Sequence, residues 1–427
     1  MRILYSHYLA EDSHPAVLMV EAIAQELRSM GHEVFIHRSA GPAVSSPAKT
    51  SGGNGKLRPR WLRNMFWFCR ALLRNRSMLA RDLEVIDTIK PEIILARQDA
   101  YCLSMPLAAS LRKIPLVTYA DAPTAYETRR YGHSDGRFHP PFLVEAIERW
   151  TLGVSQNVVT VSAPAARLLR LYGSRTPIHV VSNGIAPERF PKMSAGQRSE
   201  ARAALGLTAP LVAGFAGSFK VFHGIDKLRD LILATSSRED LQWLLIGDGP
   251  QRAALEESLA GKAAVIFLGR RPSEEVGKLL ELIDVAVAPH PQLEGEFYFC
   301  PLKILEYMAA GCAVLASQQG DIPELLDHGQ AGVTISDPST TTWTQALLHL
   351  LDHPDWRESL GDSAKARALS QYTWARTAKT IDMILSNSVR SQPDLSPPRC
   401  ESRVEEGIHG RLPSKAIATT QSPYSVK

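Results

Sequence analysis

Short apolar runs alternate with amphipathic stretches along most of the chain. An apolar run at 2–6 is followed by apolar residues at helical spacing from Val17 to Met30, and then by a second apolar run at 33–37. Gly31 is placed to end the helix, because glycine readily adopts the left-handed conformation of a C-cap. A strand, a helix and a strand in this order predict a βαβ unit and therefore a parallel sheet.

The same alternation continues through two successive α/β blocks, which meet near Ser182-Asn183-Gly184. The first block has further predicted strands at 91–96, 114–119, 157–162 and 178–181, and helices at 61–81, 103–112, 145–152 and 163–172. After a linker with a short helix at 187–209, the second block has strands at 211–216, 243–246, 264–268, 285–289 and 313–316, and helices at 225–235 and 302–310. Residues 39–60 are predicted as a mobile loop and 388–427 as a disordered tail, and the segment 121–141 is polar and is given no element.

Composition agrees with a soluble globular protein. The 427 residues are 44% hydrophobic and 22% charged, and this length suits two domains and a tail. A net charge of +4 does not indicate a nucleic-acid partner. The five cysteines are scattered, so neither a disulfide framework nor a zinc site is predicted. Without an apolar signal-peptide region or a run of about 18 apolar residues, a cytoplasmic protein is expected.

Glycines follow successive predicted strands of the second block, at Gly217, Gly247, Gly249 and Gly269. Ligands bind at the carboxyl ends of strands in open α/β sheets, and glycine lets the backbone approach a ligand closely. The segment 217–224 leads into a helix, whose N-terminus favours an anion. Each glycine alone is better explained by an ordinary strand-to-helix turn, whereas several at matching places in one domain favour a ligand crevice.

The segment 297–311 combines a basic and an acidic residue at the start of an apolar helix. Pro301 suits the helix N-terminus, and Lys303 and Glu306 share one face at i, i+3 spacing. A carboxylate beside a crevice can accept two hydrogen bonds from a vicinal diol such as ribose. A surface salt pair is the alternative.

Together and in this order, these motifs resemble retaining glycosyltransferases of family 4, which have the GT-B fold. The resemblance covers about residues 1–387 and is carried by 217–224, 247–250, 267–270 and 301–332, with 180–184 and 372–374. It implies two Rossmann-like domains facing across a cleft, with a C-terminal helix that crosses back to the first. The expected parts are an acceptor-binding domain at 1–184, a nucleotide-sugar-binding domain at 185–365, the crossover helix at 366–387 and the tail at 388–427.

The resemblance also implies transfer of a sugar from a nucleotide diphosphate donor, a UDP- or GDP-sugar, with retention and without another cofactor. Glu306 matches the acid that holds the donor ribose, Arg270 would lie beside the nucleobase, and Gly217 and Ser218 would lie against the diphosphate. The full set of expected donor-binding residues is Gly217, Ser218, His223, Gly224, Gly247, Gly249, Arg270 and Lys303.

Two departures from the family pattern bear on catalysis. The E-x7-E pattern expects an acid eight residues before Glu306, where this chain has Tyr298; Glu296 and Glu294 lie close by. The usual Arg and Lys of the phosphate loop correspond to Ser218 and His223, so Lys220 and Lys303 are the expected replacement cations. A branch with S-F-K-x-x-H-G and P-L-K-x-x-E-Y-M motifs is similar. The catalytic candidates are Glu306, Lys220, Glu296 and Tyr298.

The acceptor side is less specific. Candidates near predicted strand ends of the first domain are His7, Asp12, His14, Arg97, Asp121 and Glu127. Each could bind an acceptor hydroxyl or act as a base, although each alone is more often a surface residue. The expected acceptor is a glycan, a lipid-linked molecule or a small molecule. No D-x-D pair is present, so no metal is expected.

The helix at 61–81 mixes aromatic and basic residues and is predicted to contact an anionic membrane surface. Packing on the sheet with its Arg side in water is the alternative. For the whole protein, two other functions stay open. They are a UDP-sugar 2-epimerase on the same fold, and a sugar-nucleotide-binding protein that has lost catalysis because position 298 lacks an acid.

Overall fold

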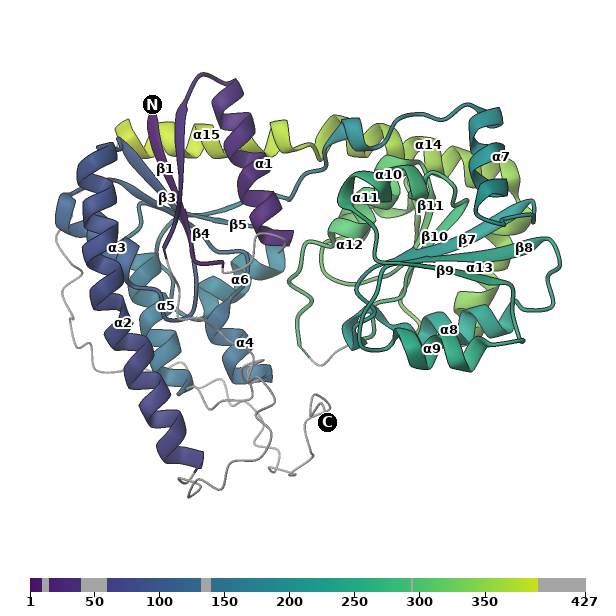
Figure 1. Cartoon of the computed structure of the whole chain (residues 1–427), viewed down its shortest axis with the longest axis horizontal. Coiled ribbons are helices and arrows are strands. Elements are labelled where there is room, and N and C mark those ends of the chain that lie inside the picture. Colours follow the sequence, from purple (N-terminus) through teal and green to yellow (C-terminus); the bar gives the residue numbers. More distant parts are fainter. Residues whose placement is uncertain (10–14, 40–59, 132–139, 293–294, 391–427) are drawn as a thin grey trace. The chain divides into compact units, whose positions relative to one another are not determined.

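Two six-stranded parallel sheets organise the computed structural model (Figure 1). It describes residues 1–9, 15–39, 60–131, 140–292 and 295–390, with side chains left out of account at 15, 60–72 and 131. The strand order is β2-β1-β3-β4-β5-β6 in the first sheet and β12-β11-β10-β7-β8-β9 in the second. The expected α/β architecture with two Rossmann-like sheets is confirmed.

The first sheet is built from alternating strands and helices. Its strands are β1 (Arg2–His7), β2 (Glu33–Arg38), β3 (Ile93–Arg97), β4 (Leu116–Tyr119), β5 (Asn157–Thr160) and β6 (Ile178–Val180). Its helices are α1 (Pro15–Ser29), α2 (Arg60–Ile89), α3 (Ser104–Arg112), α4 (Thr124–Tyr131), α5 (Pro141–Gly153) and α6 (Ala163–Leu171). Alternation along β1 sends Ile3 and Tyr5 into one core layer and Leu4 into the other, as the period of two in a strand requires.

The second sheet repeats this plan. Its strands are β7 (Leu211–Ala216), β8 (Leu241–Ile246), β9 (Val265–Gly269), β10 (Val285–Ala288), β11 (Ala313–Ser317) and β12 (Val333–Ile335). Its helices are α7 (Ala195–Ala204), α8 (Ile225–Ala234), α9 (Arg252–Leu259), α10 (Ser273–Leu280), α11 (Leu302–Ala310), α12 (Ile322–Leu325), α13 (Thr340–Asp352) and α14 (Pro354–Gln371). Helices α8 and α9 cover one face and α10 and α11 the other (Figure 1).

The last helix, α15 (Trp374–Arg390), belongs to the first sheet although it follows the second in sequence. Its Ala378, Ile381 and Leu385 are buried among β-strand residues of the first core. The crossover is therefore as expected, but its bounds differ. Residues 366–371 end α14, and 388–390 still belong to α15 because Ser388 is buried and bonded to Asn157 at 2.8 Å.

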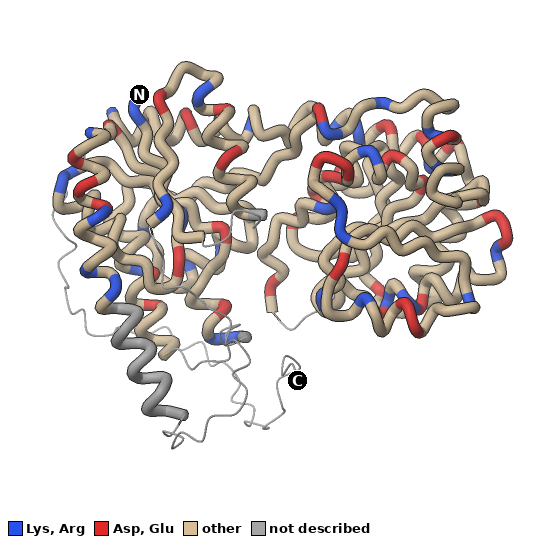
Figure 2. Tube along the Cα trace, in the orientation of Figure 1, with Lys and Arg blue, Asp and Glu red and all other residues tan. Residues whose placement is uncertain are grey.

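The sequence pattern did not predict helix α4. Helix α4 lies within the polar segment 121–141, for which no helix was predicted, because only a narrow side of it is apolar, with Ala125 and Tyr126 buried. Most of the expected loop at 39–60 and of the tail lies outside the described residues. Charged residues occupy helices and loops, whereas the strands carry them only at their ends (Figure 2). None of the helices among the described residues combines the length and the hydropathy that a membrane span requires.

Candidate functional site

The second sheet reverses its order of strand addition between β7 and β10. β7 is the first strand of this sheet in sequence, and it pairs with β8 on one side and β10 on the other. Loops that leave the carboxyl ends of two such strands run in opposite directions and open a crevice. Gly217 follows β7 and His290 lies just beyond β10, so both residues belong to this crevice.

Gly217 lies beside two basic side chains. A Cβ added at Gly217 would be 3.1 Å from Lys303 Nζ and 3.3 Å from His223 Nδ1. The missing side chain therefore leaves room next to both nitrogens. Lys303 is in the first turn of α11, where the helix dipole already favours an anion. Two sequence-predicted donor residues and a predicted replacement cation thus meet at the end of β7.

The basic nitrogens here are buried without hydrogen-bond partners. Among the described residues, Lys303 Nζ, His223 Nδ1 and His290 Nε2 have none, and Lys303 Nζ faces the Phe215 ring at 4.5 Å. Burial lowers the pKa of Lys303 to about 7, against an opposing effect of Glu306. Burial lowers the pKa of His223 to about 2 and that of His290 to about 4, and the positive charge of Lys303 is the second cause for both. A buried ammonium without a partner is costly, and an anion beside Lys303 Nζ would satisfy it.

Glu306 lies one turn after Lys303 on α11 and is 24% exposed at its side chain. Its Oε1 is 3.2 Å from Nη2 of Arg189, which belongs to the linker between the two sheets. Arg189 also donates two hydrogen bonds to the Ser273 carbonyl, at 3.1 and 2.6 Å, which fixes its guanidinium. Burial raises the pKa of Glu306, while Arg189 and Lys303 lower it. The carboxylate is therefore held by a cation that sequence analysis missed.

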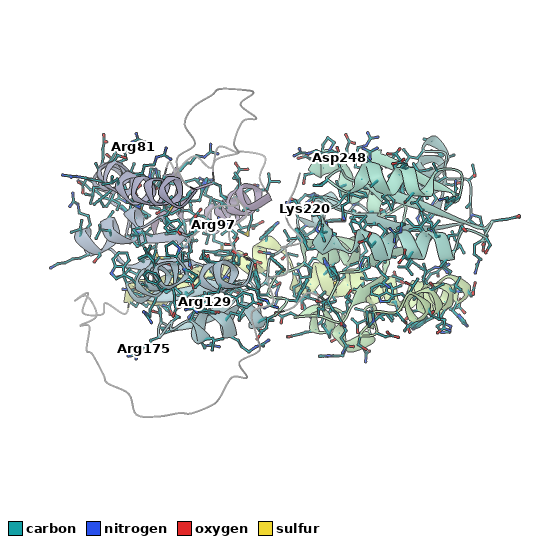
Figure 3. All side chains as sticks on the ribbon, turned by 90° about the horizontal axis from the view of Figure 1, so that it is seen from below. Arg81, Arg97, Arg129, Arg175, Lys220 and Asp248 are labelled. Atoms are coloured by element: carbon teal, nitrogen blue, oxygen red, sulfur yellow. The ribbon has the colours of Figure 1, made fainter. Side chains whose placement is uncertain are left out.

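The other expected donor residues surround this cluster. Gly247 and Gly249 have φ of 119° and 159°, and their missing side chains let the loop after β8 pass the carbonyls of Gly217 and Ser218. Ser218, Lys220 and Arg270 are exposed. Lys220, labelled in Figure 3, lies over the Phe222 ring at 5.8 Å. Of the two expected replacement cations, Lys303 has a buried ammonium, whereas Lys220 is exposed to solvent.

Tyr298 stands at the position where the family pattern expects an acid. It is 1% exposed, and its hydroxyl donates a short hydrogen bond to Glu127 of α4, an expected acceptor residue. Ser162 Oγ donates to the Tyr298 carbonyl at 2.5 Å. Glu296 is 44% exposed and pairs with Arg167 at 3.1 Å. The structure thus brings Tyr298 and Glu127 together, and it leaves Glu296 at the surface.

We expect Tyr298→Phe to destabilise the protein by about 1–3 kcal/mol, because Glu127 would lose the hydroxyl that donates to it. Burial raises the pKa of Glu127 and the Tyr298 hydroxyl lowers it, so the variant should raise that pKa further. Urea denaturation measures the loss. In a Glu127→Ala background, where no acceptor is left at this position, the same substitution should cost much less. An equal cost in both backgrounds would show that the hydroxyl does not act through Glu127.

The remaining acceptor candidates are spread over the carboxyl edge of the first sheet. Arg97, at the end of β3, pairs with Asp121 at 2.5 Å, just after β4 (Arg97 is labelled in Figure 3). His7 ends β1, is 2% exposed, and accepts a hydrogen bond from the Leu9 amide. β1 and β3 form the switch point of this sheet. His14 and Asp12 lie outside the described residues.

Two family models match most of the chain between them. "Glycosyltransferase Family 4" matches residues 16–189, and "Glycosyl transferases group 1" matches residues 210–353. The D-inositol 3-phosphate glycosyltransferase of Corynebacterium urealyticum is 28% identical over 56% of this chain and 58% of its own length. The chain therefore spans less than two thirds of that relative. The alpha-maltose-1-phosphate synthase of Mycolicibacterium smegmatis is 24% identical over 71% of this chain and 81% of its own.

Solved structures share the fold at low sequence identity. The Anabaena protein HepE in complex with UDP superposes with a TM-score of 0.69 at 17% identity, over 91% of this chain and all of that one. WaaG, a glycosyltransferase involved in lipopolysaccharide biosynthesis, superposes with a TM-score of 0.61, also at 17% identity, over 90% of this chain and 99% of that one. These likenesses support the GT-B architecture of two parallel-sheet domains.

Proposed function

This chain belongs to the family 4 and group 1 glycosyltransferases, and on that basis we propose that it transfers a sugar from a nucleotide diphosphate donor with retention at the anomeric carbon. One observation carries the proposal. Lys303 and His223 have buried, unpaired nitrogens beside Gly217, at the switch point of the second sheet. Lys303 lies one helical turn before Glu306 on α11. An anion next to a diol-binding carboxylate is the pattern of a nucleoside diphosphate. HepE, which shares the fold, is described with UDP and with UDP-glucose.

The chemistry follows from where charge develops. As the glycosidic bond of the donor breaks, negative charge accumulates on the leaving diphosphate. A fixed ammonium and the N-terminus of α11 stabilise that charge more in the transition state than in the ground state. Burial strengthens this effect, because few solvent dipoles compete with Lys303. In this proposal Lys303 is the main catalytic cation and Lys220 an accessory one.

Glu306 is proposed to bind the ribose diol, with Arg189 holding its carboxylate ionised and oriented.

We expect Glu306→Gln to weaken UDP binding by about 10- to 100-fold, because an amide accepts hydrogen bonds through one oxygen only and carries no charge to pair with Arg189. Calorimetry with UDP and with 2′,3′-dideoxy-UDP tests the role. The wild type should bind the analogue more weakly than it binds UDP. The variant should bind the analogue and UDP with similar affinity. If the substitution weakens the binding of both ligands by the same factor, Glu306 does not contact the ribose. The same experiment is done with GDP and its dideoxy analogue if only GDP raises the melting temperature.

The acceptor, the membrane surface and the absence of a cofactor are further proposals. Arg97, Asp121 and Glu127 at the edge of the first sheet are proposed to bind a glycan, lipid-linked or small-molecule acceptor within residues 1–184, while 185–365 bind the donor. Contact of 61–81 with an anionic membrane rests on the sequence, since side chains up to residue 72 lie outside the described ones. No metal is proposed, and the described residues contain no cluster of three metal-binding side chains.

Catalysis without an acid at position 298 is the unusual part of the proposal. The Tyr298 hydroxyl is bonded to Glu127 and the Glu296 carboxylate to Arg167, so a donor sugar would have to compete with these partners for either side chain. The matched relatives named above are transferases or a synthase, and none is an epimerase. We therefore favour transfer over isomerisation or loss of catalysis, with no catalytic base assigned.

A further inference from the structure

His290 is a buried histidine with one free nitrogen in the proposed donor site. It follows β10 and is 7% exposed, and its ring lies 6.1 Å from the His223 ring, between centroids. Within the described part of the chain, its Nε2 has no hydrogen-bond partner. The carbonyl of His290 accepts hydrogen bonds from Ser317 Oγ and Gln319 Nε2, at 2.6 and 2.8 Å, so the residue is firmly positioned.

The other nitrogen of His290 fixes the tautomer. Nδ1 lies 3.1 Å from the carbonyl oxygen of Phe222, which can only accept a hydrogen bond. Nδ1 therefore carries a hydrogen, and in the neutral ring Nε2 is left with a lone pair. A lone pair repels an anion. The ring can bind a phosphate oxygen through Nε2 only after it has gained a second proton.

The charged groups around His290 favour an anion next to it. The loop after β7 supplies Lys220 and His223, and α11 supplies Lys303 and Glu306, whose carboxylate is already paired with Arg189. Burial and then Lys303 lower the pKa of His290 to about 4, while the Phe222 carbonyl raises it. Without a ligand the ring is thus neutral near pH 6. A diphosphate would reverse the effect of Lys303 on this ring.

We propose that His290 is a third diphosphate-binding residue and that its ring takes up one proton from solution when a nucleotide sugar binds. The Nε2–H then donates to a phosphate oxygen, and Nδ1–H keeps its bond to the Phe222 carbonyl. The ring gains one positive charge, and the proton comes from the buffer. This inference rests on the proposed function, because it assumes that the diphosphate lies beside Gly217.

The sign of the pH dependence follows from the free and bound states. The pKa of His290 is low in the free protein and rises when the anion arrives, so binding takes up a proton at any pH between the two values. Affinity then falls as the pH rises through that window. Lys303 adds uptake only above about pH 7, its own free pKa, so at pH 6.0 the uptake comes from a histidine, and the variants at His290 and His223 show which one. Nucleotide sugars suit the test, because their diphosphate has no ionisation near pH 6, unlike a terminal phosphate.

The experiment is calorimetry of UDP-glucose and GDP-glucose at pH 6.0 in buffers of different ionisation enthalpy. We expect the wild type to take up between about 0.5 and 1 proton per ligand, and His290→Gln to take up close to none. The variant should bind about tenfold more weakly at pH 6.0, since a neutral amide replaces a charged donor. The matched control is His328→Asn, an exposed histidine in the turn before β12, which should behave as wild type.

The outcomes separate this inference from the function it rests on. If neither nucleotide sugar binds to the wild type, the donor site itself is refuted and the inference falls with it. If binding occurs without proton uptake at pH 6.0, or if the uptake persists in His290→Gln, the proposed role of His290 is refuted while the donor site stands. If His290→Gln does not fold, the absence of uptake by the wild type still refutes the role, and uptake that disappears in His223→Gln would assign the proton to His223 instead.

Discussion

Lys303→Met is expected to lower kcat for sugar transfer or donor hydrolysis by about 10²- to 10³-fold, the usual cost of removing one preorganised donor to a developing negative charge. Its Nζ lies next to Gly217, is buried, and has no hydrogen-bond partner among the described residues. Methionine keeps a similar length and replaces the ammonium by an apolar group next to Phe215. Steady-state kinetics with the nucleotide sugar that raises the melting temperature most would measure the loss.

Lys220→Met is the matched control, since Lys220 lies in the loop after β7, a few residues from Gly217, but is exposed. We expect its loss to stay within about tenfold, because water screens an exposed charge. If Lys303→Met had near-normal kcat, or if the control lost more activity, Lys303 would not be the main catalytic cation.

Stability should move in the opposite direction from activity. The folded pKa of Lys303, about 7, lies below its ordinary 10.5, so the folded state binds fewer protons there than the unfolded state. Folding is therefore penalised below pH 10.5, and the penalty is largest below about pH 7. Lys303→Met removes it, and urea denaturation at pH 7 should show a variant at least as stable as the wild type.

Gly224→Ala is expected to destabilise the protein by about 3–4 kcal/mol and to abolish measurable donor binding. Gly224 has φ of 71°, and a Cβ there would lie 1.7 Å from the Pro289 carbonyl oxygen. The loops after β7 and β10 would have to move apart, which would separate His223 from His290. Urea denaturation and calorimetry with the nucleotide sugar measure the two effects.

Gly261→Ala separates the backbone strain from the clash. Gly261 has nearly the same φ, 69°, but its added Cβ would meet nothing within 4 Å. It should cost only about 1 kcal/mol, the ordinary penalty of a left-handed non-glycine residue, and leave donor binding unchanged. Similar losses in the two variants would mean that the close approach of the loops is unimportant.

Local sequence pattern was sufficient for much of the fold. The runs at 211–216 and 302–310 predict β7 and α11 at their observed bounds, because apolar periodicity and the flanking Gly217, Pro301 and Gly311 mark both ends. Helix α4 was missed because few of its residues are apolar, so its burial depends on neighbours such as Glu148, which accepts hydrogen bonds from its first amides. That contact joins segments distant in sequence.

For the site, the sequence by itself determined which chemistry is present: glycines after strands, a lysine and a glutamate on one helix face, and the order of motifs that marks the family. Only the tertiary structure decided which groups meet. Arg189 reaches Glu306 and Tyr298 reaches Glu127, although neither pair is close in sequence or shares a pattern. His290 joins His223 because β10 and β7 are neighbours in the sheet. Spacing along a chain fixes what one helix or strand can present, whereas strand order fixes which ends lie together.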